Sequence, residues 1–432
     1  MRDLSKPTYF YLCVLLLLVG GQNVFGGTLQ VCASCPIKSV KQAVNLAKPG
    51  DRIVVNGGIY KEAGIVIAKS IQLIGQNNPV IDGNFKGQII TILADGVVVQ
   101  GFTLKNVATS YTRDDAAIRV IERSNTKILQ NTIVNTYFGI YLQNADHSEI
   151  RGNVVVGKDV TGLNESSLGN AIHLWQSNNA VITGNKVRGH RDGIYLEFVK
   201  NSRVKDNLSQ HNLRYGLHFM FSDGNVYTHN TFKRNGAGVA VMYTSNIVME
   251  RNTFEGNWGP ASYGLLLKDI RDSKIHHNTF RENTTGIYME GSNRLDVRSN
   301  TFDRNGWALR LLNSCMDDVF QYNNFTGNSF DVGTNGNSAL NRFENNYWDK
   351  YTGYDLDKDK VGDVPYRPVS LYSMLVEKVP SSVMFMRSFM VDLMDNVEKV
   401  LPSFIPDQLI DKRPMMRKID HDDNRKLTQK LR

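Results

Sequence analysis

The chain has 432 residues and a formal net charge of +8, with 41% hydrophobic residues. This length allows one large domain or two ordinary domains. Basic and acidic residues alternate along most of the chain, so the modest positive excess does not favour a nucleic-acid groove and we expect no nucleic-acid partner.

The first 26 residues have the pattern of a secretory signal peptide. Arg2 and Lys6 precede an apolar run over 9–19, and 24–26 is a candidate cleavage site. The apolar run is short for a membrane span. We therefore predict export, with a bacterial periplasm as the expected location; an uncleaved membrane anchor is the alternative.

The cysteines leave two readings open. Cys13 would be removed with the signal, and Cys32 and Cys35 have the Cys-x-x-Cys spacing without the histidine that haem attachment requires. In an oxidising compartment this pair predicts a disulfide that caps the N-terminus. A second soft metal site is the alternative, because two thiolates can hold Cu(I). Cys315 is predicted to be a lone buried thiol.

The segment before the repeats predicts a capping helix and several short strands. Apolar residues over 37–47 have helical spacing, which predicts a helix that covers the open end of a strand stack. Alternating apolar stretches separated by Gly, Asn and Asp then predict strands. These strands are expected at 53–55, 65–67, 71–74, 89–92 and 97–99.

From about residue 118 the sequence repeats with a period of 22 residues, in two independent lines. One line begins short strands with Gly or Ala, and the other is Asn-x-apolar. The first comprises Gly139, Ala171, Gly193, Gly216, Gly238, Gly264, Gly286 and Ala308; the second comprises Asn131, Asn153, Asn185, Asn207, Asn230, Asn252, Asn278 and Asn300. Both lines are displaced by the same insertions, so the register is secure.

This repeat predicts an all-β fold, a right-handed single-stranded parallel β-helix over 27–368. Asn suits the corners because it tolerates the left-handed region, and stacked Asn side chains can form a ladder. An antiparallel sandwich would not explain the constant period. The predicted core contains one apolar residue per turn: Ile140, Ile172, Ile194, Leu217, Val239, Leu265, Ile287 and Leu309.

Two adjacent strands, 216–221 and 238–243, carry an unusual set of side chains. Alternation along a strand gives each face every second residue. The inward set is expected to be Leu217, Phe219, Phe221, Val239 and Val241, and the outward set His218, Met220, Ala240 and Met242. If each repeat is one turn, Met220 and Met242 lie about one strand spacing apart, ~4.8 Å.

Thioether and imidazole ligands favour Cu(I). We therefore predict a copper site at His218, Met220 and Met242, with His173 and Glu197 as neighbours on the same face. An exposed face of aromatic, His and Met residues also fits a carbohydrate platform or a protein interface. Insertions over 157–170 and 257–262 are expected to overhang this face.

Catalysis is the rival interpretation. A sugar-cleaving β-helix needs two carboxyl groups about 5 to 9.5 Å apart. Glu197 and Glu290 lie on the outward face four turns apart, roughly 19 Å at ~4.8 Å per turn. Asp192 and Asp223 flank the face at turns and keep a polysaccharide lyase or hydrolase open as the alternative.

After the last repeat, acidic residues fall at positions 1, 3, 5 and 9 of a calcium-type loop. They are Asp355, Asp357, Asp359 and Asp363. Lys360 stands where such a loop has glycine, and Tyr366 stands where it has glutamate. A Ca²⁺ site and a solvated Asx-rich turn both remain open.

Residues 369–432 lose the β period and become rich in methionine. Apolar residues recur at helical spacing over 385–401, and the segment ends in a basic stretch. We predict a helical or extended tail whose Met-rich face docks on a membrane partner. Packing against the last turn is the alternative.

Five stretches carry a resemblance to a known family: 49–60, 171–175, 214–223, 239–243 and 354–368. The chain resembles the NosD family, periplasmic maturation proteins of nitrous oxide reductase. The resemblance implies a non-enzymatic β-helix that works with an ABC transporter permease and ATPase. It also implies that the protein receives copper from a chaperone lipoprotein and delivers it to apo nitrous oxide reductase, with the tail docked on the permease. A pure docking scaffold is a third interpretation.

Overall fold

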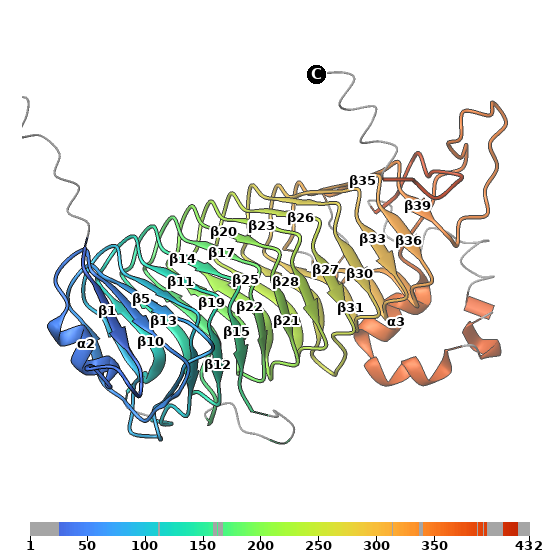
Figure 1. The fold of residues 1–432 in the computed structure, drawn as a ribbon. Coiled ribbons are helices and arrows are strands. Elements are labelled where there is room, and N and C mark those ends of the chain that lie inside the picture. The colour runs from blue at the N-terminus through green and yellow to red at the C-terminus, as the bar shows by residue number, and fades with distance from the viewer. Residues whose placement is uncertain are drawn as a thin grey trace, which may run out of the picture.

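The structure is a computed structural model that describes residues 26–110, 113–158, 162, 167–312, 314–336, 340–386, 388–391, 393–394 and 409–421. The predicted signal peptide, except for Gly26, lies outside the described residues, as do parts of the 157–170 insertion and of the tail. Figure 1 shows one elongated coil in which successive turns stack along a single axis.

Three parallel sheets run the length of this coil, and a complete turn contributes one strand to each sheet. The first sheet contains β1 (Thr28–Val31), β2 (Arg52–Val55), β5 (Gln72–Gly75), β8 (Val98–Gln100), β11 (Lys127–Leu129), β14 (Glu149–Arg151), β17 (Val181–Thr183), β20 (Arg203–Lys205), β23 (Val226–Thr228), β26 (Val248–Glu250), β29 (Lys274–His276), β32 (Asp296–Arg298), β35 (Val319–Gln321) and β38 (Arg342–Glu344).

The second sheet contains β3 (Ile59–Tyr60), β6 (Val80–Asp82), β9 (Thr103–Lys105), β12 (Thr132–Val134), β15 (Val154–Val156), β18 (Lys186–Arg188), β21 (Leu208–Gln210), β24 (Thr231–Lys233), β27 (Thr253–Glu255), β30 (Thr279–Arg281), β33 (Thr301–Asp303), β36 (Asn324–Thr326) and β39 (Tyr347–Trp348).

The third sheet contains β4 (Ile65–Ile67), β7 (Ile90–Ile92), β10 (Ala116–Ile121), β13 (Phe138–Gln143), β16 (Ile172–Trp175), β19 (Ile194–Glu197), β22 (Tyr215–Met220), β25 (Ala237–Met242), β28 (Tyr263–Lys268), β31 (Thr285–Glu290), β34 (Trp307–Leu311) and β37 (Phe330–Gly333). The predicted parallel β-helix is confirmed, with about 13 turns.

The core lies inside the three sheets. All eight residues of the predicted apolar line, including Leu217 and Val239, are buried. Rings also stack along the axis, as Phe280 does on Phe254 and Phe302, with centroids 4.6 and 5.0 Å apart. Such pairs add about 0.5–1.5 kcal/mol each beyond the area they bury.

The asparagine line forms a continuous buried ladder, and its geometry corrects the prediction. Asn252 Oδ1 accepts hydrogen bonds from the backbone N–H and side-chain amide of Asn230, both at 3.0 Å. The residue before the ladder asparagine has the left-handed backbone, for example Arg251 with φ 55°. The asparagine at this position is therefore explained by its buried hydrogen bonds and not by its tolerance of a left-handed backbone conformation.

The glycine line is explained by close approach between turns. A Cβ on Gly238 would lie 2.3 Å from the carbonyl oxygen of Gly264 in the next turn. A side chain at this position would push neighbouring turns apart, which is why most of the strand starts carry glycine.

The N-terminal end is closed as predicted. Helix α2 (Val40–Leu46) begins at Ser39, whose side chain accepts a hydrogen bond from the Gln42 N–H, and it buries Val40 and Val44 against the first turns. Cys32 and Cys35 form a disulfide, so the disulfide interpretation is confirmed and the thiolate metal site is not present in this state. Cys315 is a buried free thiol, as expected.

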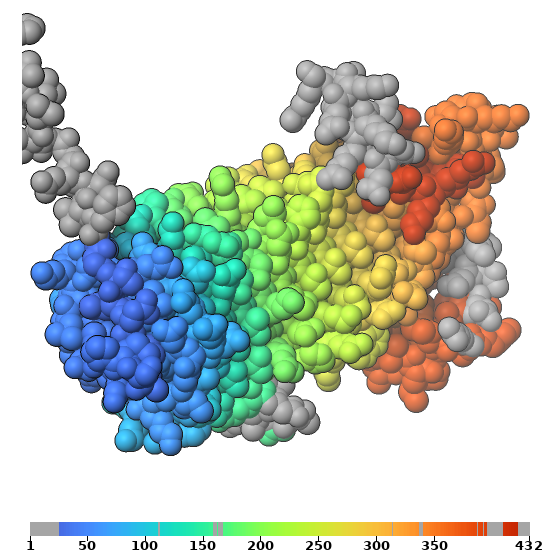
Figure 2. Space-filling view, viewed as in Figure 1, coloured from blue at the N-terminus to red at the C-terminus, as the bar shows by residue number. Residues whose placement is uncertain are grey.

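The C-terminal end is closed by two separate pieces of the tail. Helix α3 (Leu371–Lys378) packs on β37 of the last turn, and its Glu377 forms a bidentate ion pair with Arg310 of the preceding strand, β34. The 3₁₀ helix η2 (Pro380–Phe385) follows. Residues 409–421 were expected in the docking tail, but they return to the β-helix and pair with its last turns. Figure 2 shows this red segment against the orange turns.

Helical structure in the described part of the tail is short. None of the helices in the described residues has the length and apolarity needed to cross a membrane.

One predicted orientation is wrong. Phe221 was placed with Leu217 and Phe219 on the inward face, yet it is 39% exposed. Strand β22 ends at Met220, and Phe221 has a left-handed backbone with φ 49°. Alternation stops at this corner, so the ring points outward.

Candidate functional site

The outer face of the third sheet brings the predicted ligands into one register. His218 pairs with Tyr195 in the preceding turn, and Tyr195 pairs with His173. In the neighbouring column, Met220 pairs with Glu197 on one side and with Met242 on the other. All five predicted residues therefore lie in two adjacent columns that cross four consecutive turns.

The two methionines lie at the open side of these columns. Met220 and Met242 are both half-buried, whereas Phe219 and Val241 between the columns are in the core. The Tyr195 hydroxyl donates to Met220 Sδ at 3.9 Å. The thioethers are thus held on the outer face and remain accessible.

His218 is more deeply placed than the sequence suggested. It is only 5% exposed, because the rings of Tyr195 and Tyr215 each lie with their centroids 4.9 Å from the imidazole. His218 lies on the predicted outward face, but the prediction that its imidazole is exposed is wrong. The two rings belong to two different turns, and the repeat pattern of the sequence did not show that they cover the imidazole.

The partners of His218 are the two members of an ion pair, the buried Asp192 and the partly exposed Arg214. Nδ1 lies 3.3 Å from Arg214 Nη2 and 3.7 Å from Asp192 Oδ2. In the tautomer with hydrogen on Nε2, Nδ1 accepts a hydrogen bond from the guanidinium. In the tautomer with hydrogen on Nδ1, that N–H points toward the carboxylate. The second tautomer leaves the Nε2 lone pair available for a metal, which is the arrangement that carboxylate–histidine–metal sites use.

Asp192 holds this arrangement in place. It is fully buried, and its carboxylate accepts both Arg214 Nε at 3.0 Å and Arg214 Nη2 at 2.8 Å. Burial opposes its ionisation, but interactions with His218 and Arg214 outweigh that effect and lower the pKa of Asp192. The residue is a charged support for His218.

His173 lies one turn beyond Tyr195 and stays neutral. Its ring stacks on Tyr141 with centroids 4.5 Å apart and meets Tyr195 edge-on at 4.7 Å. Burial, with Arg191 nearby, lowers the pKa of His173 to about 3. A neutral imidazole at physiological pH is a competent metal ligand without loss of a proton.

Both imidazoles carry a buried Nε2 atom that makes no hydrogen bond. The Asn170 side chain, which lies 3.4 Å from His173 Nδ1, also has a buried oxygen without a partner. Buried polar atoms are normally satisfied, and each orphan costs about 1–3 kcal/mol. Unsatisfied nitrogens on two imidazoles of the same column, with Tyr195 between them, indicate that this face has capacity for a ligand.

Glu197 completes the set at its edge. It is half-buried and contributes to the raised pKa of Tyr195, which burial chiefly raises to about 12. The Tyr195 phenol therefore remains protonated and donates its hydrogen. The sequence interpretation did not include Arg214 or Tyr215 in the site, although both directly precede the Gly216 strand start.

The four carboxylates considered for a glycosidase site are either far apart along the coil or hydrogen-bonded to other residues. Four parallel strand pairings separate Glu197 from Glu290. Asp192 is occupied by Arg214, and Asp223 Oδ1 accepts hydrogen bonds from Ser245 N and Oγ. Glu197 and Glu290 are therefore too far apart to act as a sugar-cleaving pair, and Asp192 and Asp223 are held by hydrogen bonds to other residues.

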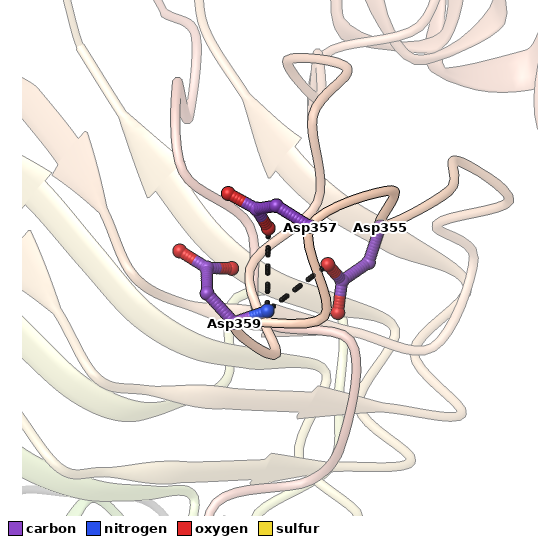
Figure 3. Close-up of side chains that lie close together, drawn as sticks. All are labelled: Asp355, Asp357 and Asp359. Atoms are coloured by element: carbon purple, nitrogen blue, oxygen red, sulfur yellow. Dashed lines mark hydrogen bonds between the residues drawn. The ribbon is translucent and has the colours of Figure 1, made fainter.

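The acidic loop after the repeats gathers three of its four predicted residues. Oxygens of Asp355, Asp357 and Asp359 lie within 4.8 Å of one another, as Figure 3 shows. The Asp359 N–H donates to Asp355 Oδ1 and Asp357 Oδ1, both at 3.2 Å, whereas Asp363 accepts from Leu356 N. These bonds are those of an Asx-rich turn, and the calcium site stays a prediction.

The fold places the chain in the class of parallel β-helix proteins, a class that includes many carbohydrate-active enzymes. Its architecture is similar to a GH87 α-1,3-glucanase from Streptomyces thermodiastaticus, with a TM-score of 0.58 and 12% identity over 74% of this chain and 69% of that one. It is also similar to a family 28 exopolygalacturonase from Yersinia enterocolitica, with a TM-score of 0.51 and 10% identity over 74% and 78%. At these identities the likeness concerns the fold alone.

Sequence comparison is more specific. A family model described as periplasmic copper-binding protein (NosD) matches residues 156–355, and a model described as a protein of unknown function (DUF1565) matches 19–243. The second match covers more than half of the chain, so the chain belongs to the family that the DUF1565 model describes, and it is similar to NosD proteins over 156–355. It is 27% identical to a probable ABC transporter binding protein NosD of Pseudomonas aeruginosa, over 82% of this chain and 85% of that one. The corresponding protein of Stutzerimonas stutzeri is 26% identical, over 81% and 84%.

Proposed function

We propose that this chain is an exported periplasmic accessory protein that binds Cu(I) on the outer face of its third sheet. In this proposal it receives Cu(I) from a chaperone lipoprotein and, with an ABC transporter permease and ATPase, delivers it to apo nitrous oxide reductase. The family model supports copper binding in the periplasm, and the names of the two relatives support the transporter association. The delivery step rests on the family resemblance.

The observation that carries the proposal is the unsatisfied Nε2 of His218 on the same strand as one of two paired thioethers, with a second such imidazole, His173, two turns away. His173 and His218 each offer a buried Nε2, and Met220 and Met242 occupy paired positions on adjacent strands. Soft thioethers with neutral imidazoles form a donor set that prefers Cu(I) to harder ions. Glu197 is the proposed neighbour that adds negative charge at the edge.

A half-buried site of this kind suits transfer rather than storage. The methionines are accessible from outside, while the imidazoles lie beneath the tyrosine rings. Copper arriving from solvent or from a partner would therefore contact the thioethers first. Thiolates, which would hold Cu(I) more tightly, are absent from these two columns.

The proposed contact with the transporter permease lies in the tail. Met384, Phe385, Phe389, Met390 and Leu393 are large apolar residues with substantial exposure, and Phe389 is 80% exposed. Apolar side chains concentrated in one short exposed segment mark an interaction site, and methionines adapt to a partner's surface. Membrane association would then be indirect, through the permease.

Copper binding is tested by anaerobic competition of the protein with a chromophoric Cu(I) chelator. The variant Met220→Leu/Met242→Leu removes both sulfurs with little change in volume, and Met316→Leu is the matched control because Met316 is exposed away from the site. We expect at least a tenfold loss of Cu(I) affinity in the double variant and none in the control. Equal affinity in all three proteins would eliminate this site.

The alternative functions have separate tests. A polysaccharide lyase or hydrolase is tested with uronate and neutral glycans, and turnover that is lost in Asp192→Asn would favour it over copper transfer.

Docking of the tail is tested by measuring how the variant Phe389→Ser/Met390→Ser binds to vesicles that contain the transporter. The control is Ile59→Ser, which changes an exposed apolar residue at the other end of the coil. Unimpaired binding of the tail variant would contradict permease docking.

A further inference from the structure

Three exposed aromatic rings form a stack beside the proposed copper site. Phe198, Phe221 and Tyr243, here called the aromatic corner, are 41%, 39% and 42% exposed. The Phe198 and Phe221 centroids are 5.1 Å apart with the rings 9° from parallel, and those of Phe221 and Tyr243 are 5.2 Å apart at 12°. The corner therefore presents a continuous apolar ridge across three turns.

The backbone at these positions does not call for aromatic residues. All three have left-handed conformations, with φ of 54°, 49° and 53°. Equivalent corners of the flanking turns hold Gln176 on one side and Asp269 on the other, with φ of 48° and 54°. Bulky residues with positive φ are outliers that cost about 1 kcal/mol or more each. Their presence in three consecutive turns, with the rings in solvent, points to a role other than turn formation.

The position of the ridge ties it to the copper site. Each ring belongs to the residue that directly follows a member of the column that contains the methionines: Glu197, Met220 or Met242. Any protein that brings copper within bonding distance of the two sulfurs must cover the ridge as well. An apolar contact there would exclude water around the transferring ion.

An acidic hollow borders the same ridge. A cavity of about 470 Å³ is lined by Phe221, Tyr243, Asp223, Asp269 and Arg271, among others. Asp223 accepts hydrogen bonds from Ser245, while within the described part of the chain the Asp269 carboxylate has no ion pair or side-chain hydrogen bond. Two carboxylates and one guanidinium leave a negative excess, which is complementary to a basic side chain.

The ring geometry disfavours a sugar ligand. Sugars pack on open aromatic faces, but here both faces of the central ring, Phe221, are covered by its two neighbours, so only its edge is left for contact. Ring edges are the side on which thioether sulfurs make favourable contacts. The ridge therefore suits a protein surface with apolar or methionine side chains.

We propose that the aromatic corner and the acidic hollow form the docking surface for the protein that loads Cu(I), and that this donor places a basic side chain in the hollow. The inference rests on the proposed function, because it assumes transfer at Met220 and Met242. A donor is the occupant, rather than the acceptor, because the accessible thioethers form the entry side of the ligand set and the buried imidazoles lie beneath them.

The test uses the full chain and the Cu(I)-loaded chaperone lipoprotein as the probe, with binding and transfer rates measured separately. Phe221→Asn/Tyr243→Asn replaces the rings with a residue that favours left-handed corners, so the fold is retained. Phe85→Asn is the matched control, since Phe85 is exposed with φ 55° at a distant loop. We expect the double variant to bind the chaperone at least about tenfold more weakly, while its own affinity for Cu(I), measured by chelator competition, is unchanged. Asp269→Asn should weaken binding of the chaperone as well.

The two proposals fail in different ways. If Met220→Leu/Met242→Leu retains Cu(I) affinity, the copper site is wrong whatever the docking result. If that variant loses copper but the aromatic variant docks and loads like the unmodified chain, the docking inference alone is overturned. A loss confined to binding of the apo-reductase, or to binding of alginate and glucan oligosaccharides, would also overturn it.

Discussion

The Oδ2 atom of Asp411 accepts hydrogen bonds from both the backbone N–H and the side-chain amide of Asn346, each at 3.0 Å. The same oxygen accepts Trp348 Nε1 at 3.0 Å. Asn346 is the last member of the buried asparagine ladder, so a residue 65 positions later takes the place of the next rung. The return of 409–421 to the body thereby closes the C-terminal end of the solenoid.

Removal of this acceptor should open the end of the coil. In Asp411→Ala, three buried donors lose their partner, and at about 1–3 kcal/mol per orphan we expect a loss of roughly 3 kcal/mol or more. Because stability in a solenoid is a sum over neighbouring turns, the effect should be largest near the last turn. Hydrogen exchange at 341–349, together with thermal unfolding, measures it.

The matched variant for this prediction is Asp411→Asn, which keeps a carbonyl oxygen for the three donors. Burial raises the pKa of Asp411, so an uncharged amide should be tolerated there and protection of 341–349 should be largely retained. Equal protection in Asp411→Ala and the unmodified chain would show that the segment does not close the coil.

A second prediction concerns Asp318, a buried carboxyl in the line of small polar residues that link successive turns. Its Oδ1 accepts the Leu295 N–H at 2.8 Å, and its Oδ2 has no partner. Burial raises the pKa of Asp318 to about 8 from an ordinary value of 3.8. The protonated folded form is favoured, so this group's contribution to stability is present below about pH 4 and is lost as the pH rises towards 8.

Asp318→Asn should remove that loss, because Asn341 shows that an amide fits the equivalent position of the next turn. We expect the variant to be more stable than the unmodified chain by about 1–3 kcal/mol or more at pH 8.5 and nearly equal to it at pH 4. Urea unfolding at the two pH values measures the difference. Asp114→Asn, at an exposed carboxylate, is the control; the same gain at both pH values would contradict the pKa argument.

Much of the fold was predictable because a solenoid translates sequence period directly into spatial register. The 22-residue step and strand alternation sufficed to place Met220 beside Met242 and Leu217 in the core. Alternation holds only within a strand, however. It failed one residue later at Phe221, where the chain enters a left-handed corner.

The rest of the site depends on contacts between turns that no local pattern marks. Tyr195 covers His218 from the preceding turn and Tyr215 from its own strand, while Asp192, paired with Arg214, approaches it from the preceding turn. The return of 409–421 has no repeat of its own, and one buried carboxylate fixes it on the ladder. Such features follow from packing and charge after the coil has formed.

The last prediction uses Asp192 to separate support of a ligand from general stability. The carboxylate lies 3.7 Å from His218 Nδ1, where it favours the tautomer whose Nε2 can bind metal. In Asp192→Asn the negative charge is lost while the shape is retained. If the copper proposal holds, Cu(I) affinity should fall by about 10-fold or more, the usual effect of removing such a supporting carboxylate.

Asp272→Asn is the matched control for this variant, since Asp272 also forms a bidentate pair with an arginine, Arg294, but on the exposed surface. It should leave Cu(I) affinity unchanged. Chelator competition and thermal unfolding of both variants distinguish the two effects: lower affinity in Asp192→Asn at preserved stability supports a positioning role. If the two variants lose stability to the same extent and neither loses Cu(I) affinity, Asp192 has a structural role only, and the proposal that His218 binds the metal loses its support.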